Sequence, residues 1–288
     1  MSVPFALSSA LTYGIADFAG GLAARRAPVL VVTAVAQSAG LVALLPAVWL
    51  LGGTPSVAAL GFGALAGIAG ATGLLLYFRG LAVGPMGVVA PLSAVVGAGL
   101  PLAVGWLGGE RPGTVTLAAI AVALGAILLA TAGTRGDTAA STGLLLGLGS
   151  GVGFGLFFVG LDATPSESGL WPLVAGRVVS VSLLLTLVLV HRARTPVPVG
   201  ATPSGAPARA PLPVRLMVVS GVFDTLANVL FLVATRLGAL GVSAVVVSLY
   251  PVVVVLLARV VLRERLTGTQ LVSAGLALGA SVLLSATG

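Results

Sequence analysis

The sequence has no cysteine, no lysine and little charge of either sign. Only 7% of its 288 residues are charged and 58% are hydrophobic, whereas an average soluble domain is about 25% charged. Because so few charges cannot cover a water-facing surface, the composition argues against a soluble enzyme, a disordered chain and a nucleic-acid-binding module. The absence of cysteine excludes disulfides, thiolate metal sites and cysteine nucleophiles.

The few charges that are present are mostly basic, and every basic residue that is not histidine is an arginine. A net charge of +7 can indicate a nucleic-acid partner, but in a chain this apolar it favours loop charge that sets membrane orientation. No Walker or Rossmann pattern occurs, so we expect neither ATP hydrolysis nor a dinucleotide cofactor. We expect no other cofactor, no metal and no nucleic-acid partner.

Long apolar runs fill most of the chain. A helix needs about 20 apolar residues to cross a bilayer, and continuous runs favour helices over the alternating strands of a β-barrel. The sequence therefore predicts an all-α integral membrane protein with ten transmembrane helices. A segment rich in proline and arginine, 191–215, is predicted to be a polar linker. The predicted spans are 3–22, 28–51, 57–80, 86–107, 114–132, 141–160, 170–190, 214–235, 242–262 and 268–287.

The two halves of the chain repeat each other. Gly67 and Gly221 are in register at an offset of 154 residues, and in the same register the run Ala123 to Ala126 is identical to the run Ala277 to Ala280. We therefore expect two five-helix domains, 1–135 and 141–288. Since five spans is an odd number, the second copy enters the membrane from the opposite side. Inverted repeats of this kind are typical of secondary transporters, which bind substrate near the membrane midplane.

The residues that carry this repeat resemble a known family. They run from Gly84-Pro85-Met86-Gly87-Val88 to Glu110-Arg111, and from Gly238-Ala239-Leu240-Gly241-Val242 to Glu264-Arg265. This pattern is similar to that of EamA-type members of the drug/metabolite transporter superfamily. The resemblance implies a ten-helix transporter whose substrate is an amino acid, a nucleoside, a sugar or a drug. Glu110, Arg111, Glu264 and Arg265 are interpreted as structural markers of the repeat.

Orientation is left open by two opposing indications. Most loop arginines, from Arg25 and Arg26 to Arg263 and Arg265, follow odd-numbered spans. By the positive-inside rule those connections are cytoplasmic, which places both termini outside. The resemblance implies the reverse, with both termini in the cytoplasm.

Charges within the predicted spans are the candidate functional residues, because ionisable groups in a bilayer are costly. Asp224 lies near the middle of its span, and Asn228 shares its helix face at i+4. Arg177 lies at a similar depth, within about 5 Å along the membrane normal. Asp224 can bind the substrate amine, carry a coupling proton or be neutralised by Arg177. Arg177 can instead bind an anionic group of the substrate.

Other polar residues within the spans are weaker candidates. Asp17 is expected either to serve the site or to pair with Arg25 near the membrane surface. Gln37 fits a cross-helix hydrogen bond or a ligand contact. Tyr13 and Tyr250 are deep enough to line a cavity. Tyr77 and Trp171 are assigned to the interfacial aromatic belt because they lie near span ends.

Taken together, these residues predict a secondary transporter in the cell (cytoplasmic) membrane. It would move a small polar metabolite, such as an amino acid, by alternating access, and export is the expected direction. A coupling proton is a possible partner, and the expected assembly is a monomer or a weak dimer. The alternatives are a passive channel or facilitator and a non-transporting membrane scaffold protein.

Overall fold

The structure is a computed structural model. It describes residues 2–107, 113–115, 117–118, 121–122, 125–126, 129, 138–194, 211–237, 247, 250–263 and 267–287. Within these residues the regular structure is helical, without a strand. The helices are α1 (Ser2–Ala24), α2 (Val29–Leu51), α3 (Val57–Val83), α4 (Met86–Leu107), α6 (Thr138–Asp162), η1 (Ser166–Ser168), α7 (Trp171–Arg194), α8 (Val214–Leu237), α10 (Tyr250–Val261) and α11 (Gly268–Thr287).

These bounds confirm the predicted helical class, and the start and end of most spans agree within a few residues. Five of the helices are long and apolar enough to cross a membrane, and shorter apolar helices accompany them in the described part of the chain. The predicted count of ten spans is not confirmed. The range 114–132 lies largely outside the described residues, and 242–262 is described at Val247 and from Tyr250 onward.

Local chemistry explains where several helices begin and end. The Ser56 side chain caps α3 by accepting a hydrogen bond from the Ala59 amide at 3.1 Å. Gly52, with a φ of 67°, ends α2 in a conformation that disfavours other residues. Pro85 and Pro213 precede α4 and α8, and their carbonyls accept from amides in the first helical turn.

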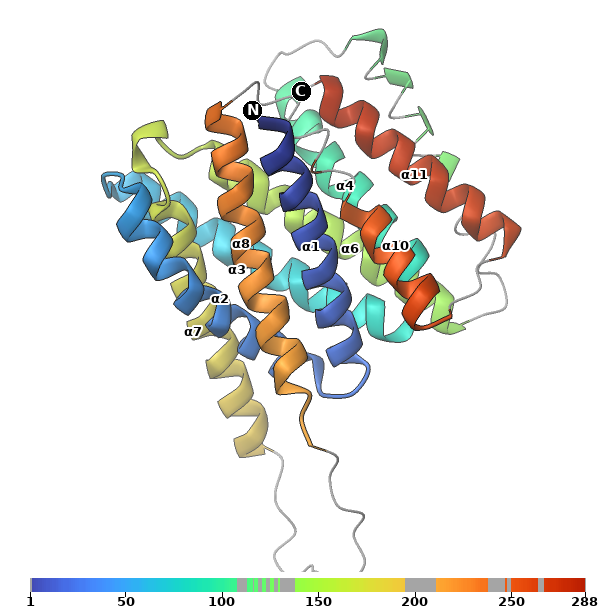
Figure 1. The fold of residues 1–288 in the computed structure, drawn as a ribbon, viewed down its shortest axis with the longest axis horizontal. Coiled ribbons are helices and arrows are strands. Elements are labelled where there is room, and N and C mark those ends of the chain that lie inside the picture. Colours follow the sequence, from blue (N-terminus) through green and yellow to red (C-terminus); the bar gives the residue numbers. More distant parts are fainter. Residues whose placement is uncertain are drawn as a thin grey trace, which may run out of the picture.

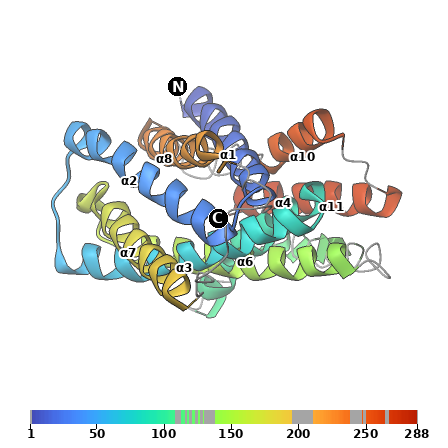
Figure 2. The ribbon, with the colours of Figure 1, turned by 90° about the horizontal axis from the view of Figure 1, so that it is seen from below.

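The helices form two groups on either side of a shared interior. Figure 2 shows α1, α8 and α10 on one side, and α3, α6 and α7 on the other. Figure 1 shows that the N- and C-termini lie at the same end of the bundle. Buried side chains such as Phe78, Leu81 and Met86 join α1, α3, α4, α8 and α10 in one apolar core. Outward-facing residues such as Trp49, Leu65 and Leu145 are exposed apolar side chains, as a lipid-facing surface requires.

Glycine lets helices from different halves touch through their backbones. A Cβ added to Gly67 on α3 would lie 2.3 Å from the carbonyl oxygen of Gly176 on α7. A Cβ added to Gly221 on α8 would lie 1.9 Å from the carbonyl oxygen of Ala36 on α2. Neither position has room for a side chain, so close packing within one chain accounts for these glycines. Gly67 and Gly221 are also the pair that occupies equivalent positions in the sequence repeat.

Candidate substrate-binding cavity

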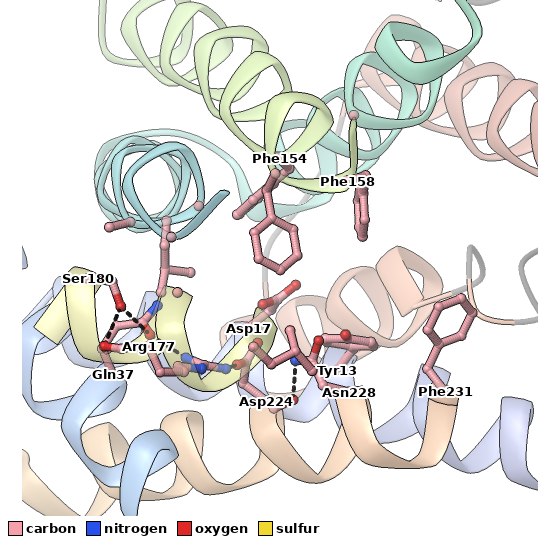
Figure 3. A pocket seen from close by; sticks show the side chains of 18 of the residues that line it. Tyr13, Asp17, Gln37, Phe154, Phe158, Arg177, Ser180, Asp224, Asn228 and Phe231 are labelled. Atoms are coloured by element: carbon pink, nitrogen blue, oxygen red, sulfur yellow. Dashed lines mark hydrogen bonds and ion pairs between the residues drawn. The ribbon is translucent and has the colours of Figure 1, made fainter. Parts of the chain in front are cut away.

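A cavity of ≈ 340 Å³ opens between the two groups of helices. Its lining comes from α1, α2, α3, α4, α6, α7, α8 and α10, with Val247 preceding α10. Figure 3 shows the polar side chains of Asp17, Asp224 and Arg177 on one side and the rings of Phe154 and Phe158 on the other. The volume is near the lower end of the range for small-molecule sites, about 300–1,000 Å³.

An ionic cluster that joins three helices forms part of this lining. The Arg177 guanidinium on α7 forms an ion pair with the Asp224 carboxylate on α8 and donates to the Gln37 side-chain oxygen on α2. Ser180, one turn beyond Arg177, donates to the same Gln37 oxygen at 3.3 Å. Because the Arg177 side chain is 13% exposed and that of Asp224 is 25% exposed, the pair is largely shielded but accessible from the cavity.

Asn228 stands one helical turn from Asp224 on the cavity face of α8. Its side-chain nitrogen donates to the Asp224 backbone carbonyl at 2.8 Å. The side-chain oxygen of Asn228 takes no part in that bond, and the residue contributes to the cavity lining. The predicted shared face of Asp224 and Asn228 is therefore present.

Asp17 belongs to a second polar group, on the α1 side of the cavity. Its carboxylate accepts a hydrogen bond from the Tyr77 hydroxyl of α3 at 3.0 Å. The predicted alternative, pairing with Arg25, is wrong for the described residues. Arg25 instead donates to the carbonyls of Leu81 and Gly84 at the end of α3, at 3.0 and 3.2 Å. The arginine thus satisfies helix-terminal carbonyls and leaves the Asp17 carboxylate to the tyrosine.

Tyr77 is the residue whose predicted place must be corrected. It is fully buried, and its ring meets that of Phe154 edge-on at 5.6 Å. Its distance from the helix end predicted an interfacial position, but α1 and α6 cover this part of α3. Trp171 agrees better with its assignment, because it begins α7 and its indole nitrogen donates to the Gly53 carbonyl in the α2–α3 connection.

Aromatic rings supply much of the remaining wall. Of the chain's three tryptophans, three tyrosines and nine phenylalanines, six line this cavity. Tyr13 and Tyr250 lie with ring centroids 6.0 Å apart, and Phe157 and Phe158 5.5 Å apart. The aromatic lining residues are Tyr13, Phe154, Phe157, Phe158, Phe231 and Tyr250.

The seven residues predicted for the site all contribute to this one cavity. They are Tyr13, Asp17, Gln37, Arg177, Asp224, Asn228 and Tyr250. The phenylalanines were not predicted, although Phe154, Phe157 and Phe158 have the i, i+3, i+4 spacing of one helix face. The repeat markers Glu110, Arg111, Glu264 and Arg265 lie outside the described residues. In the part of the chain that the structure describes, no three His, Asp or Glu side chains gather as metal ligands would.

The fold and the cavity define a multi-pass, all-helical membrane protein with an ionic site enclosed by its helices. The sequence model of the EamA-like transporter family matches residues 141–286, half of the chain. The chain therefore belongs to the EamA-like transporter family, part of the drug/metabolite transporter superfamily, and is a membrane transporter.

Two other comparisons concern the curated proteins and the solved structures. No curated protein matches the chain. A solved structure titled "Crystal structure of protein" has a TM-score of 0.57 and 16% identity, and covers 98% of this chain and 95% of that chain. At this identity the likeness concerns the fold alone, which extends over nearly the whole length of both chains.

Proposed function

We propose that the protein is a secondary carrier that exports a small polar metabolite, such as an amino acid, across the cytoplasmic membrane by alternating access. The cavity is the observation that carries this proposal. Its charged residues, Asp17, Arg177 and Asp224, lie within long apolar helices, and its walls come from both halves of the sequence repeat. A site between inverted repeats is the arrangement that rocking-bundle carriers use.

Each polar residue has a role in this proposal. Asp224 binds the substrate amine or a coupling proton, and Arg177 binds an anionic group or, in the empty carrier, Asp224 itself. Gln37 and Asn228 orient the substrate through hydrogen bonds, and Tyr13 and Tyr250 close the α1–α10 side. Asp17 adds a second negative charge. The carrier acts as a monomer or a weak dimer, with the lipid bilayer as its surroundings.

Counterflow in proteoliposomes tests the carrier mechanism. A carrier preloaded with its substrate accelerates uptake of the labelled compound and saturates, whereas a channel or facilitator gives flux proportional to concentration without counterflow. A screen of amino acids, nucleosides, sugars and small amines with the purified full chain should therefore yield saturable counterflow for at least one compound. A scaffold would give flux for none of them.

Asp224→Asn tests the assigned site. We expect this change to abolish transport while the purified protein remains monodisperse, because the amide keeps the carboxylate's shape and loses its charge. Ser9→Ala is the matched control: it removes an α1–α8 hydrogen bond to the Ala227 carbonyl, outside the cavity lining, and should retain transport. Full activity of Asp224→Asn would remove Asp224 from the mechanism.

The cysteine-free sequence allows a direct test of the orientation of the chain in the membrane. Arg192 is exposed near the end of α7, so Arg192→Cys introduces a single thiol on one side of the membrane. Labelling by a membrane-impermeant maleimide in intact cells would place this end outside. Labelling only after lysis would place it in the cytoplasm, as the arginine distribution predicts.

A further inference from the structure

We propose that the cavity takes an organic monocation, an amine with an apolar group about the size of one aromatic ring, and that Asp17, oriented by Tyr77, binds its charged head. This inference rests on the proposed carrier; it places the substrate amine at Asp17 instead of Asp224 and replaces the amino acid with an amine that has no carboxylate. It follows from the charges of the lining, the state of each donor and acceptor, and the position of the rings.

The cavity lining is one positive charge short of neutrality. Its ionisable carboxylates and guanidinium are Asp17, Asp224 and Arg177, which sum to a formal charge of −1 when all are ionised. Arg177 is paired with Asp224, and among the described residues Asp17 has no ion pair and accepts only the Tyr77 hydroxyl. Because an uncompensated charge within a membrane protein is costly, Asp17 requires a proton or a bound cation, and binding of an amine compared with an alcohol of the same shape separates these two cases.

The same arrangement disfavours an anion. The terminal nitrogens of Arg177 already serve Gln37 and Asp224, and Ser180 fixes the Gln37 oxygen from the other side. An incoming carboxylate would compete with Asp224, the ion-pair partner of Arg177 in the described structure, for the same guanidinium, and it would share the cavity with the Asp17 carboxylate. The carboxylate of a zwitterion would meet this competition for Arg177 and the negative charge of Asp17, whereas a monocation has no negative group.

The rings of the lining favour a cation that carries an apolar group. The faces of aromatic rings attract cations, and desolvation strengthens this attraction to about 2 kcal/mol or more. Tyr77 is buried outside the lining and donates a hydrogen bond to Asp17. Its ring packs edge-on against Phe154, which is part of the aromatic wall. A charged head at Asp17 therefore leaves its substituent among Phe154, Phe157 and Phe158, in a cavity whose ≈ 340 Å³ limits it to a small molecule.

Calorimetric titration of the detergent-purified full chain tests this proposal with probes of matched shape. In mildly acidic buffer, phenethylamine is a cation, phenethyl alcohol is neutral and phenylacetate is an anion. Phenylalaninamide and phenylalanine form a second pair, a monocation and a zwitterion. We expect phenethylamine and phenylalaninamide to bind at least about tenfold more tightly than their uncharged, anionic or zwitterionic counterparts, the usual effect of one charge-assisted hydrogen bond.

Substitutions then assign the binding to Asp17. Asp17→Asn should weaken phenethylamine binding by about tenfold or more while its Tm stays near that of the wild type, because the amide oxygen still accepts from Tyr77. Asp17→Glu should restore part of the affinity by restoring the charge. Ser9→Ala, which removes a different α1 hydrogen bond, should lower Tm and leave the affinity unchanged.

Three results would overturn the inference: equal binding of phenethylamine and phenethyl alcohol, equal binding of phenylalanine and phenylalaninamide, or unchanged affinity in Asp17→Asn. The charge series on the wild-type protein decides the question even if a variant does not fold. Counterflow separates this inference from the carrier proposal. Counterflow of sugars or zwitterions without amine binding would support a carrier and overturn the monocation site, whereas Asp17-dependent amine binding without any counterflow would support the site and not the carrier.

Discussion

The two carboxylates of the cavity have the same chemistry but different neighbours. Asp224 lies in an ion pair with Arg177, and through Arg177 and Gln37 it links α8, α7 and α2. Among the described residues, Asp17 links α1 to α3 through the neutral hydroxyl of Tyr77. The ion pair neutralises its own charge and ties helices of both halves together, whereas the hydrogen bond from Tyr77 brings no compensating cation to Asp17. The difference indicates that Asp224 contributes more to the fold and that Asp17 has charge available for a ligand.

Breaking the ion pair should have the largest effect on stability. Arg177→Ala leaves Asp224 without a cation, which we expect to lower the free energy of unfolding by about 2–4 kcal/mol, somewhat below the cost for a fully buried pair because the cavity admits water. Thermal unfolding in detergent measures this. Adding Asp224→Asn should recover part of the loss; a double variant no more stable than Arg177→Ala would mean that the unpaired charge of Asp224 is not the cause of the loss.

Gly221→Ala should have the next largest effect on stability, because Gly221 lets α8 pack directly against α2 one turn before Asp224. Its added Cβ would lie 1.9 Å from the Ala36 carbonyl oxygen, so the helices that carry Asp224 and Gln37 must separate. We expect a loss of about 1–3 kcal/mol in the free energy of unfolding, typical of overpacking. Gly61→Ala on α3, with nothing within 4 Å of its added Cβ, is the matched control and should be neutral or slightly stabilising. Equal Tm values for the two variants would contradict this packing.

Tyr77→Phe should have the smallest effect on stability, and it tests the contribution of Asp17. It removes the hydroxyl that donates to Asp17 at 3.0 Å and keeps the ring against Phe154. We expect a loss of about 1 kcal/mol in the free energy of unfolding, the usual value for one hydrogen bond. A fall in Tm as large as that of Arg177→Ala would show that Asp17 stabilises the fold as strongly as Asp224 does.

Much of the fold could be predicted because the bilayer imposes a simple requirement. Apolar runs long enough to span it have to be helical, so the predicted range 86–107 has the same bounds as α4, Met86–Leu107. The other end of the chain allows a partial check: the predicted range 242–262 is described at Val247 and from Tyr250 onward, and α10 ends at Val261.

The site could be predicted where its residues are rare in membrane helices. Asp224, Arg177 and Asp17 stand out because charge is scarce, and helix depth alone suggested that Arg177 and Asp224 could meet. Depth does not give rotation about the helix axis, and for this reason Tyr77 was assigned to the membrane interface rather than to the contact with Asp17. Phe154 and Phe158 were missed because an apolar ring on an apolar helix looks the same whether it faces lipid or a cavity.

The formal charge of −1 in the cavity lining has an electrical consequence. A carrier that reoriented empty would move this negative charge through part of the membrane field, at about 2.3 kcal/mol for each elementary charge carried across 100 mV. Loaded with a monocation, the same cavity is neutral and the field does no work on its reorientation. The membrane potential would therefore act on the return of the empty carrier, and the voltage-sensing element would be the vacant binding site itself.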